Sequence, residues 1–408
     1  MNKLRKSITR IKKIIKFFNS RNKLKKVLFI SHDGSLTGAP IILLNFFKWY
    51  YYENKKNDTV FDILFLKNGA IVNNFKEFNS NIYILPEKNN FSFDNEKLLS
   101  IFDNLFFTFS YYINYKILIL NLKSNNYKLI YANTTVSLNY SIYLKKIINK
   151  NLNIICHCHE LKCVIKKSVP NFYNFSKEVF KFIAVSQIVK DVLVNDYQIE
   201  ENKINLIYEF SDKINNKLNT KIETINKKFI VGASGFVHWR KGYDIFIQVA
   251  RLLFELRPTD NIEFMWVGEL DDLHKIIISN DLSNLNLMSK VHFVGIKNDP
   301  ISFFNNFDIF ILPSREDPFP LVCIEVALLG KPIICFEKAT GISEVICEGG
   351  GYVVPYLNIE KMVEQILFYH DNSSKLECDS LKVKKLFDKF NSENSCSMIH
   401  DTIQNSIK

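Results

Sequence analysis

The sequence of 408 residues has no uninterrupted apolar run that reaches the roughly 18 residues of a membrane-spanning helix. It also shows no repeat at solenoid periods, which excludes a repeat array. Its eight cysteines are scattered, mostly within expected strands and helices, and so predict free thiols in a reducing cytosol. Apolar residues make up 47% and charged residues 23%, the balance of a globular protein long enough for two domains.

Acidic residues are absent from the start of the chain. Residues 1–26 contain eleven Lys and Arg, which account for the whole net charge of +11. Between Leu4 and Phe18, apolar residues recur at helical spacing and form a stripe on a basic helix. A secretory signal needs an apolar core that lysines do not interrupt, so the segment does not fit one.

A basic amphipathic helix fits an anionic membrane surface. We therefore predict a cytoplasmic protein that binds peripherally to the inner face of the cell membrane through residues 1–20. Nucleic acid is an alternative partner, but the rest of the chain carries no basic excess, so no nucleic-acid binding is expected. A solvated leader without a partner is the third interpretation.

From Lys25 onwards, expected strands and helices alternate, as in α/β folds with parallel sheets. A polar stretch at 211–228 separates two such series. The strands are expected at 25–32, 61–67, 81–86, 128–134, 153–159 and 181–186, and then at 228–235, 262–268, 291–296, 308–314, 332–337 and 351–356.

Two doubly wound, Rossmann-like domains that face each other across a cleft explain this order. The expected parts are a basic leader at 1–24, an N-terminal domain at 25–210, a linker at 211–228, a C-terminal domain at 229–388 and a helix at 389–408 that could cross back to the N-terminal domain. Ligands of such folds bind at the carboxyl ends of the strands, so the loops there are the candidate sites.

Residues 308–334 predict a strand, a turn, a short helix and a second strand. Two prolines within three residues make the turn, Pro320 fits a helix's first turn, and Gly330 marks the helix end. The amides of Leu321 and Val322 then lack intrahelical acceptors, and helix N-termini of this kind bind phosphate.

Charged residues accompany this helix start. Asp317 precedes it and Glu325 lies inside it, and beside a phosphate site a carboxylate suits the hydroxyls of a ribose or hexose. The alternative is a buried α/β unit with two ordinary surface acids. Arg240 and Lys241 fall just before another helix, and two adjacent cations suit a diphosphate. A solvated helix start is the alternative for that pair.

Loops of the N-terminal half carry weaker signals. The loop 34–38 brings glycines to a strand exit, but its spacing is not Gly-x-Gly-x-x-Gly, which disfavours a dehydrogenase. His157 and His159 alternate with cysteines along a strand, which places the two residue types on opposite faces, so no metal site is expected. Ser186 is expected as a helix N-cap.

Residues 314–325 resemble the donor-binding signature of family 4 glycosyltransferases, the large retaining group with the GT-B fold. That signature has a serine, an acid, a Gly-Phe-Gly-like turn and a glutamate eight positions after the acid. Ser314, Asp317, Phe319 and Glu325 fill these places. Prolines stand in place of both glycines, as in the Glu-Asp-Pro-Phe-Pro branch of the family.

The resemblance extends to other loops. Gly38 matches the glycine of a loop that closes over the donor, and His159 matches a histidine that contacts the transferred sugar. Lys241 matches the lysine that binds the pyrophosphate. Many members carry an arginine where this chain has Phe236, and we expect Arg240 to supply the second cation.

The resemblance covers residues 27 to 375. It implies a retaining glycosyltransferase of hexosyl type that moves a sugar from a nucleotide-sugar donor to a glycan or lipid-linked acceptor in the biosynthesis of lipopolysaccharide, capsule or a similar cell-surface polysaccharide. It places the nucleotide sugar on the C-terminal domain and implies no metal or other cofactor, because protein cations neutralise the diphosphate. The implied catalytic residues are Asp317, His159 and Lys241. The implied donor-binding residues are Gly38, Gly235, Arg240, Lys241, Phe319, Leu321, Val322 and Glu325.

Two other functions share this fold. A nucleotide-sugar epimerase would use the same donor site without an acceptor groove and would isomerise the donor alone. A non-catalytic GT-B subunit would show loss of the acidic pair or of the lysine, and this chain has all three residues.

Overall fold

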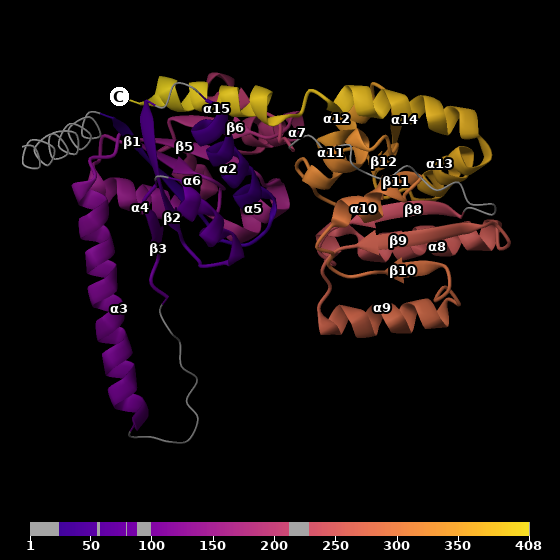
Figure 1. Cartoon of the computed structure of the whole chain (residues 1–408), viewed down its shortest axis with the longest axis horizontal. Helices are drawn as coiled ribbons and strands as arrows, with labels where there is room; N and C mark the ends of the chain where they lie inside the picture. The colour runs from indigo at the N-terminus through magenta and orange to yellow at the C-terminus, as the bar shows by residue number, and fades with distance from the viewer. Residues whose placement is uncertain (1–23, 55–57, 79, 88–98, 212–227, 408) are drawn as a thin grey trace, which may run out of the picture. The chain divides into compact units, whose positions relative to one another are not determined.

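The computed structural model describes residues 24–54, 58–78, 80–87, 99–211 and 228–407 (Figure 1). Nearly all of the predicted leader and linker lies outside the described residues, and both stay predictions. The chain divides into two compact units, which are Met1–His157 with Asn171–Phe182 and His400–Lys408, and Cys158–Pro170 with Ile183–Ile399. The predicted domain boundaries likewise stay predictions.

The first sheet has seven strands in the order β3-β2-β1-β4-β5-β6-β7. They are β1 (Lys25–Ser31), β2 (Thr59–Phe65), β3 (Ile82–Ile84), β4 (Leu129–Ala132), β5 (Asn153–Cys158), β6 (Lys181–Ala184) and β7 (Ile204–Leu206). The pairs from β3 to β5 are parallel, and β1 is buried along 27–30, as a central strand of a doubly wound sheet must be. The sequence predicts six of these strands and misses β7, because three residues are too few to show a period.

The helices of this region are α2 (Gly38–Lys48), α3 (Leu99–Ser124), α4 (Leu138–Ile148), α5 (Lys162–Ser168), α6 (Phe172–Ser176) and α7 (Gln187–Asp191). Shorter 3-10 helices lie at Ala70–Glu77 and Glu201–Lys203, and π-helical turns at Trp49–Glu53 and Val192–Asp196. None of the described helices combines the length and the apolar character needed to cross a bilayer.

The second sheet has six strands in the order β10-β9-β8-β11-β12-β13, and the pairs are parallel. They are β8 (Phe229–Ser234), β9 (Ile262–Val267), β10 (Val291–Phe293), β11 (Ile309–Leu312), β12 (Ile333–Phe336) and β13 (Gly351–Val354). All six confirm the predicted strands. Within β8, a Cβ at Gly232 would lie 2.1 Å from the ring of Phe307, so glycine is required here for the ring to pack against the strand.

The helices of the second half are α8 (Tyr243–Leu256), α9 (Asp272–Asn284), α10 (Pro300–Asn305), α11 (Leu321–Leu328), α12 (Ile342–Ile346), α13 (Ile359–Asp371), α14 (Ser373–Phe387) and α15 (Ser392–Ser406). Helices α8 and α13 pack on the strands, where Phe246 meets Phe264 and Trp266 edge to face. The last part of α15 belongs to the first unit, in which Asn153 donates a hydrogen bond of 2.8 Å to the carbonyl of Ser406.

Candidate functional site

The predicted strand, turn and helix are present as β11 and α11. Pro320 immediately precedes the helix instead of lying in its first turn, with φ −67° and ψ 129°. The amide of Cys323 donates to the carbonyl of Pro320 at 3.0 Å, and the amides of Leu321 and Val322 come before this bond. Those two amides are therefore the candidates for a phosphate ligand. The helix ends as expected, because Gly330 has a φ of +73°.

Asp317 lies in the turn between β11 and α11 and is surrounded by donors. Its carboxylate oxygens lie 2.6 Å from Nζ of Lys241, 3.5 Å from Nη1 of Arg240 and 3.2 Å from Oγ of Ser314. Burial by itself raises the pKa of this carboxyl, but Lys241 and then Arg240 outweigh burial, so the pKa lies below its usual value. Asp317 is a buried, ionised carboxylate compensated by the predicted cation pair.

Two glycines let the cations approach this turn. Gly235 has a φ of +141°, and a Cβ there would lie 3.3 Å from the Lys241 side chain. Gly242 has a φ of +74°, and its Cβ would lie 2.0 Å from the carbonyl oxygen of Pro313. The 3-10 helix Trp239–Lys241 therefore depends on Gly242 at its C-terminal end, and on Gly235 beside the Lys241 side chain, to lie against the turn after β11.

A second ion pair, which the sequence does not reveal, ties the same segments together. Arg315 donates to both carboxylate oxygens of Asp244 at 2.9 and 2.7 Å and to the carbonyl of Trp239 at 2.7 Å. Arg240 in turn donates to the carbonyl of Glu316 at 2.8 Å. Arg315 and Asp244 are 71 positions apart and belong to no common motif, so only the fold brings them together.

Glu325 contrasts with Asp317. It is the fifth residue of α11 and is partly buried. Burial raises the pKa of its carboxyl to about 7. Within the described part of the chain, no hydrogen bond or ion pair compensates this side chain. A carboxyl of this kind can form hydrogen bonds with the hydroxyls of a ligand.

His159 directly follows β5, and its Nδ1–H donates to the carboxylate of Glu209 across 2.5 Å. Both side chains are buried, with 7% and 8% exposed. Burial by itself lowers the pKa of His159, but the charge and hydrogen bond of Glu209 outweigh it and raise the pKa. Sequence reasoning misses Glu209, because it lies 50 residues away, beyond a strand that has no sequence signal.

The strand end that carries Glu209 contacts the turn that carries Asp317. Tyr208 packs its ring on that of Phe319, with the centroids 5.2 Å apart. Its hydroxyl donates to the carboxylate of Glu344 at 3.1 Å. Both contacts lie within the second unit. The buried His–Glu pair and the Asp317 cluster are thus linked through direct neighbours.

Residues 215–380 match the family model of the glycosyl transferases group 1. The similarity places a group 1 glycosyl transferase segment in the C-terminal half of the chain. The whole second sheet and the Asp317 cluster lie within the matched residues.

Two curated relatives show the extent of the similarity. The capsular polysaccharide biosynthesis glycosyltransferase CapM of Staphylococcus aureus is 27% identical over 196 residues, which cover 45% of this chain and 50% of the relative. The N,N'-diacetylbacillosaminyl-diphospho-undecaprenol alpha-1,3-N-acetylgalactosaminyltransferase of Campylobacter jejuni is 28% identical over 187 residues, or 42% and 46% of the two chains. The chain thus spans about half the length of the curated relatives it matches.

Solved structures match over nearly the full length. Anabaena Alr3699/HepE in complex with UDP and glucose superimposes with a TM-score of 0.73 at 17% identity, over 93% of this chain and 99% of that one. The lipopolysaccharide outer core galactosyltransferase WaaB in its apo form has a TM-score of 0.69 at 15% identity, over 94% and 100%. At such identities the likeness concerns the fold, and it confirms the predicted α/β GT-B class with its two doubly wound sheets.

Within the matched segment, Phe319 has a packing role. Its side chain is 3% exposed, and its ring lies against those of Tyr208 and Phe390, at 5.2 and 5.1 Å between centroids. The ring is therefore enclosed by neighbours and does not present a face to a donor. Any donor contact at this position falls to the backbone.

The cap of α7 differs from the expected one. Ser186 occupies the N-cap position with extended backbone angles, but its side chain makes no capping hydrogen bond. The carboxylate of Glu344 instead accepts from the amides of Gln187 and Ile188 at 3.0 and 2.8 Å. A full negative charge at a helix N-terminus satisfies two amides at once, which one hydroxyl does not. Ser186 thus occupies the expected N-cap position, but the expectation that its side chain caps the helix is wrong, because Glu344 accepts the bonds from the helix amides.

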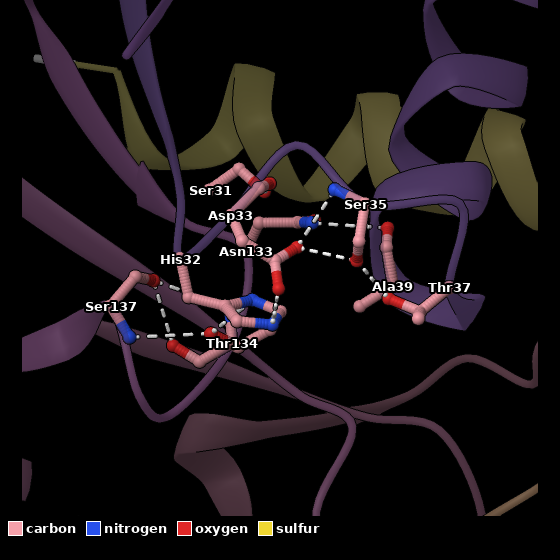
Figure 2. Close-up of polar contacts among 9 residues, drawn as sticks. All are labelled: Ser31, His32, Asp33, Ser35, Thr37, Ala39, Asn133, Thr134 and Ser137. Carbon is pink, nitrogen blue, oxygen red and sulfur yellow. Dashed lines mark hydrogen bonds and ion pairs between the residues drawn. The ribbon is translucent and has the colours of Figure 1, made fainter. Parts of the chain in front are cut away.

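The glycine-rich loop after β1 belongs to the first unit, and Figure 2 shows how its side chains hold it. Asp33 accepts from the amide and the hydroxyl of Ser35 at 3.1 and 2.8 Å, and lies 3.3 Å from Nε2 of His32. Burial raises the pKa of Asp33, but the His32 and Ser35 contacts outweigh it and lower the pKa to about 2. An ionised Asp33 therefore fixes the loop across the physiological range.

Two glycines of this loop differ in what they provide. A Cβ at Gly34 would lie 2.6 Å from Val72 and 2.9 Å from the amide nitrogen of Gly69, so the fold itself needs glycine there. A Cβ at Gly38, the first residue of α2, would meet no atom of the described residues within 4 Å. The space beside Gly38 is open, as a residue that approaches a ligand requires.

The His and Cys residues of β5 are integrated into the sheet. Cys156, His157 and Cys158 are buried, and Nδ1 of His157 lies 2.8 Å from the hydroxyl of Tyr131. Across the ranges that the structure describes, no group of three His, Cys, Asp or Glu side chains is arranged to hold a metal ion.

Proposed function

We propose that this chain is a retaining hexosyltransferase that moves a sugar from a nucleotide-sugar donor to a glycan or lipid-linked acceptor in cell-surface polysaccharide biosynthesis. The observation that carries the proposal is the buried Asp317–Lys241–Arg240 cluster at the start of α11. The names of the relatives, which refer to capsular polysaccharide and to a diphospho-undecaprenol-linked glycan, support this class of acceptor, and the UDP and glucose of the HepE structure support the class of donor.

The cations of the cluster are suited to the donor's diphosphate. A diphosphate carries more negative charge than Asp317, so it can engage Lys241 and Arg240 together, with the amides of Leu321 and Val322 as further donors. Negative charge on the diphosphate grows as its bond to the sugar breaks. Cations held in place by the fold stabilise that growing charge without reorganisation, and this supplies the main catalytic effect.

The reaction exchanges bonds on one face of the sugar. The bond from the anomeric carbon to the diphosphate oxygen breaks, and the acceptor oxygen bonds to the same carbon from the same side. The acceptor's proton passes to the departing phosphate oxygen, and the configuration is retained. Asp317 and His159 hold hydroxyls of the transferred sugar during this step.

Glu325 is assigned to the ribose hydroxyls, which it holds equally in the ground and transition states. Glu325→Gln should therefore raise the donor KM by about tenfold and leave kcat within about twofold. Because the pKa of Glu325 is raised to about 7, donor affinity should weaken as the pH falls through 7 and the carboxylate gains a proton. Initial rates across pH test this, and a pH-dependence that persists in Glu325→Gln would contradict the assignment.

The mechanism uses protein cations in place of a divalent ion. Transfer should accordingly persist, within about twofold, after dialysis against EDTA and in the continued presence of excess chelator. Loss of transfer that a single divalent ion restores would overturn this part of the proposal. It would also reopen the question of what the His and Cys residues of β5 bind.

The basic leader is assigned to an anionic membrane surface on the cytoplasmic side. Binding of the full chain to phosphatidylglycerol vesicles should weaken steeply as the salt concentration rises and screening shortens to about 8 Å. Deletion of residues 1–20 should remove this salt-dependent part of the binding and leave nucleotide-sugar binding intact. A full chain that ignores such vesicles at low salt would show that the leader is not an anchor.

A panel of nucleotide sugars tests the function directly. A stabilising thermal shift with one donor, followed by transfer to a lipid-linked acceptor with the donor's anomeric configuration in the product, is the expected result. Isomerisation of the donor without an acceptor would identify an epimerase. Binding of a donor without any turnover would identify a non-catalytic subunit.

A further inference from the structure

Helix α3 carries large apolar side chains on two faces. On one face Leu118 and Leu122 are buried in the first unit, with 6% and 0% exposed. On the other, large side chains are between 41% and 66% exposed. This second group, the α3 stripe, consists of Phe109, Tyr112, Ile113, Ile117 and Leu120.

The spacing of the α3 stripe makes it one continuous surface. Phe109, Ile113, Ile117 and Leu120 follow one another at intervals of three or four residues, and Tyr112 lies three residues after Phe109, which places them along a single side of a helix. At about 100° per residue, that side is nearly opposite Leu118 and Leu122. Figure 1 shows α3 projecting beyond the strands of its unit. Packing within the unit therefore explains one apolar face of α3 and leaves the other to solvent.

The charge along residues 104–159, which include the α3 stripe, has one sign. Residues 104–159 contain no Asp or Glu. Lys116 and Lys123 are exposed on the same side of α3 as the stripe. Tyr112 of the stripe is 60% exposed. Aliphatic side chains bordered by Tyr and Lys are the composition of a surface that lies at a lipid headgroup boundary.

A second copy of the chain fits this surface less well. Two α3 stripes packed together would enclose Lys116 and Lys123 of both copies, and residues 104–159 offer no acidic side chain to pair with them. Anionic lipid headgroups, by contrast, complement the lysines while the acyl region receives the aliphatic side chains.

We propose that the α3 stripe lies in the interfacial layer of an anionic bilayer, parallel to the membrane plane. It supplies the apolar, salt-insensitive part of membrane binding, and the basic leader supplies the salt-dependent part. The inference rests on the proposed function in one respect, since a lipid-linked acceptor would be located in the membrane to which the α3 stripe binds.

The test uses the full chain and vesicles of phosphatidylglycerol with phosphatidylethanolamine at high salt. The variant Ile113→Gln/Ile117→Gln/Leu120→Gln should lower the vesicle partition coefficient by about 1,000-fold, since burial of each of the three aliphatic side chains contributes about a factor of ten. The matched control is Leu273→Gln/Ile276→Gln on α9, whose side chains are 64% and 69% exposed in the second unit. The control should partition like the unmodified chain.

Hydrogen exchange of the unmodified chain provides a second measurement, which does not depend on whether a variant folds. The amides of residues 109–124 should exchange more slowly when vesicles are added. Protection limited to the leader, protection of α3 that is already complete without vesicles, or equal partitioning of the triple variant would each overturn the proposal. Nucleotide-sugar binding is measured in the same samples, so its absence, with vesicle binding intact, would count against the proposed function alone.

Discussion

Replacement of Lys241 by alanine should lower kcat by about 100-fold or more while the donor KM changes much less. Lys241 lies 2.6 Å from Asp317. In the proposed mechanism its ammonium group binds the donor diphosphate, and this interaction is strongest in the transition state, when the leaving group gains negative charge. An interaction that strengthens in the transition state appears in kcat, whereas one that is equal in both states appears in KM. Steady-state kinetics with the best donor of the panel measure the two quantities separately.

The control for this variant is Lys361→Ala. Lys361 also forms an ion pair, with Glu364, but both side chains are more than half exposed, so its loss should leave kcat within about twofold. Thermal unfolding of both variants shows whether the loss of rate reflects loss of fold. Near-normal kcat in folded Lys241→Ala would place the diphosphate elsewhere and would remove the central observation of the proposed mechanism.

Replacement of Glu209 by glutamine should impair the enzyme at high pH much more than at low pH. Glu209 keeps the pKa of His159 raised, against the opposing effect of burial and with a smaller contribution from Glu160. Without the Glu209 charge, His159 should lose its proton at a lower pH. We expect kcat/KM to fall by about tenfold on the high-pH side of the profile and to recover towards the unmodified value on the low-pH side. The pH–rate profile is the measurement.

Two further observations separate positioning of His159 from a general effect on the fold. Glu209→Gln should add little to His159→Gln, because the first residue is argued to act through the second. Stability should follow the same titration. Since the pKa of His159 is raised in the folded chain, the pair's contribution is present below the unfolded pKa and is lost as the pH rises through the folded one. An equal loss of kcat/KM at every pH would contradict the positioning role.

The strands and the donor turn could be predicted because each is encoded by neighbours in the chain. Runs such as 309–312 and 333–336 are apolar on both faces, which only a buried parallel strand explains. The turn before α11 follows from its prolines, and the helix end follows from Gly330. The strand β7 was not predictable, since three residues do not establish a period and its place is decided by pairing with β6.

The roles of individual side chains were less accessible. Phe319 matches a donor-binding motif, yet its ring packs between Tyr208 and Phe390. Burial of an aromatic ring against other apolar side chains is favourable, and the fold supplies these two rings beside the turn. Ser186 has the residue type of a cap, but a carboxylate from α12 reaches the same amides and binds them more strongly. In both cases a distant segment decided the outcome.

The sequence by itself determined the fold class, the order of the strands along the chain, the presence of Asp317, Glu325 and Lys241, and the basic charge of the leader. Each of these depends on residue type and on spacing along the chain. Only the tertiary structure decided which charges pair and which groups remain exposed. It compensates Asp317 with Lys241, leaves Glu325 without a cation partner, joins His159 to Glu209 and leaves one apolar face of α3 uncovered. These outcomes depend on distances of a few ångströms between segments far apart in sequence, and Coulomb and burial energies are set by such distances.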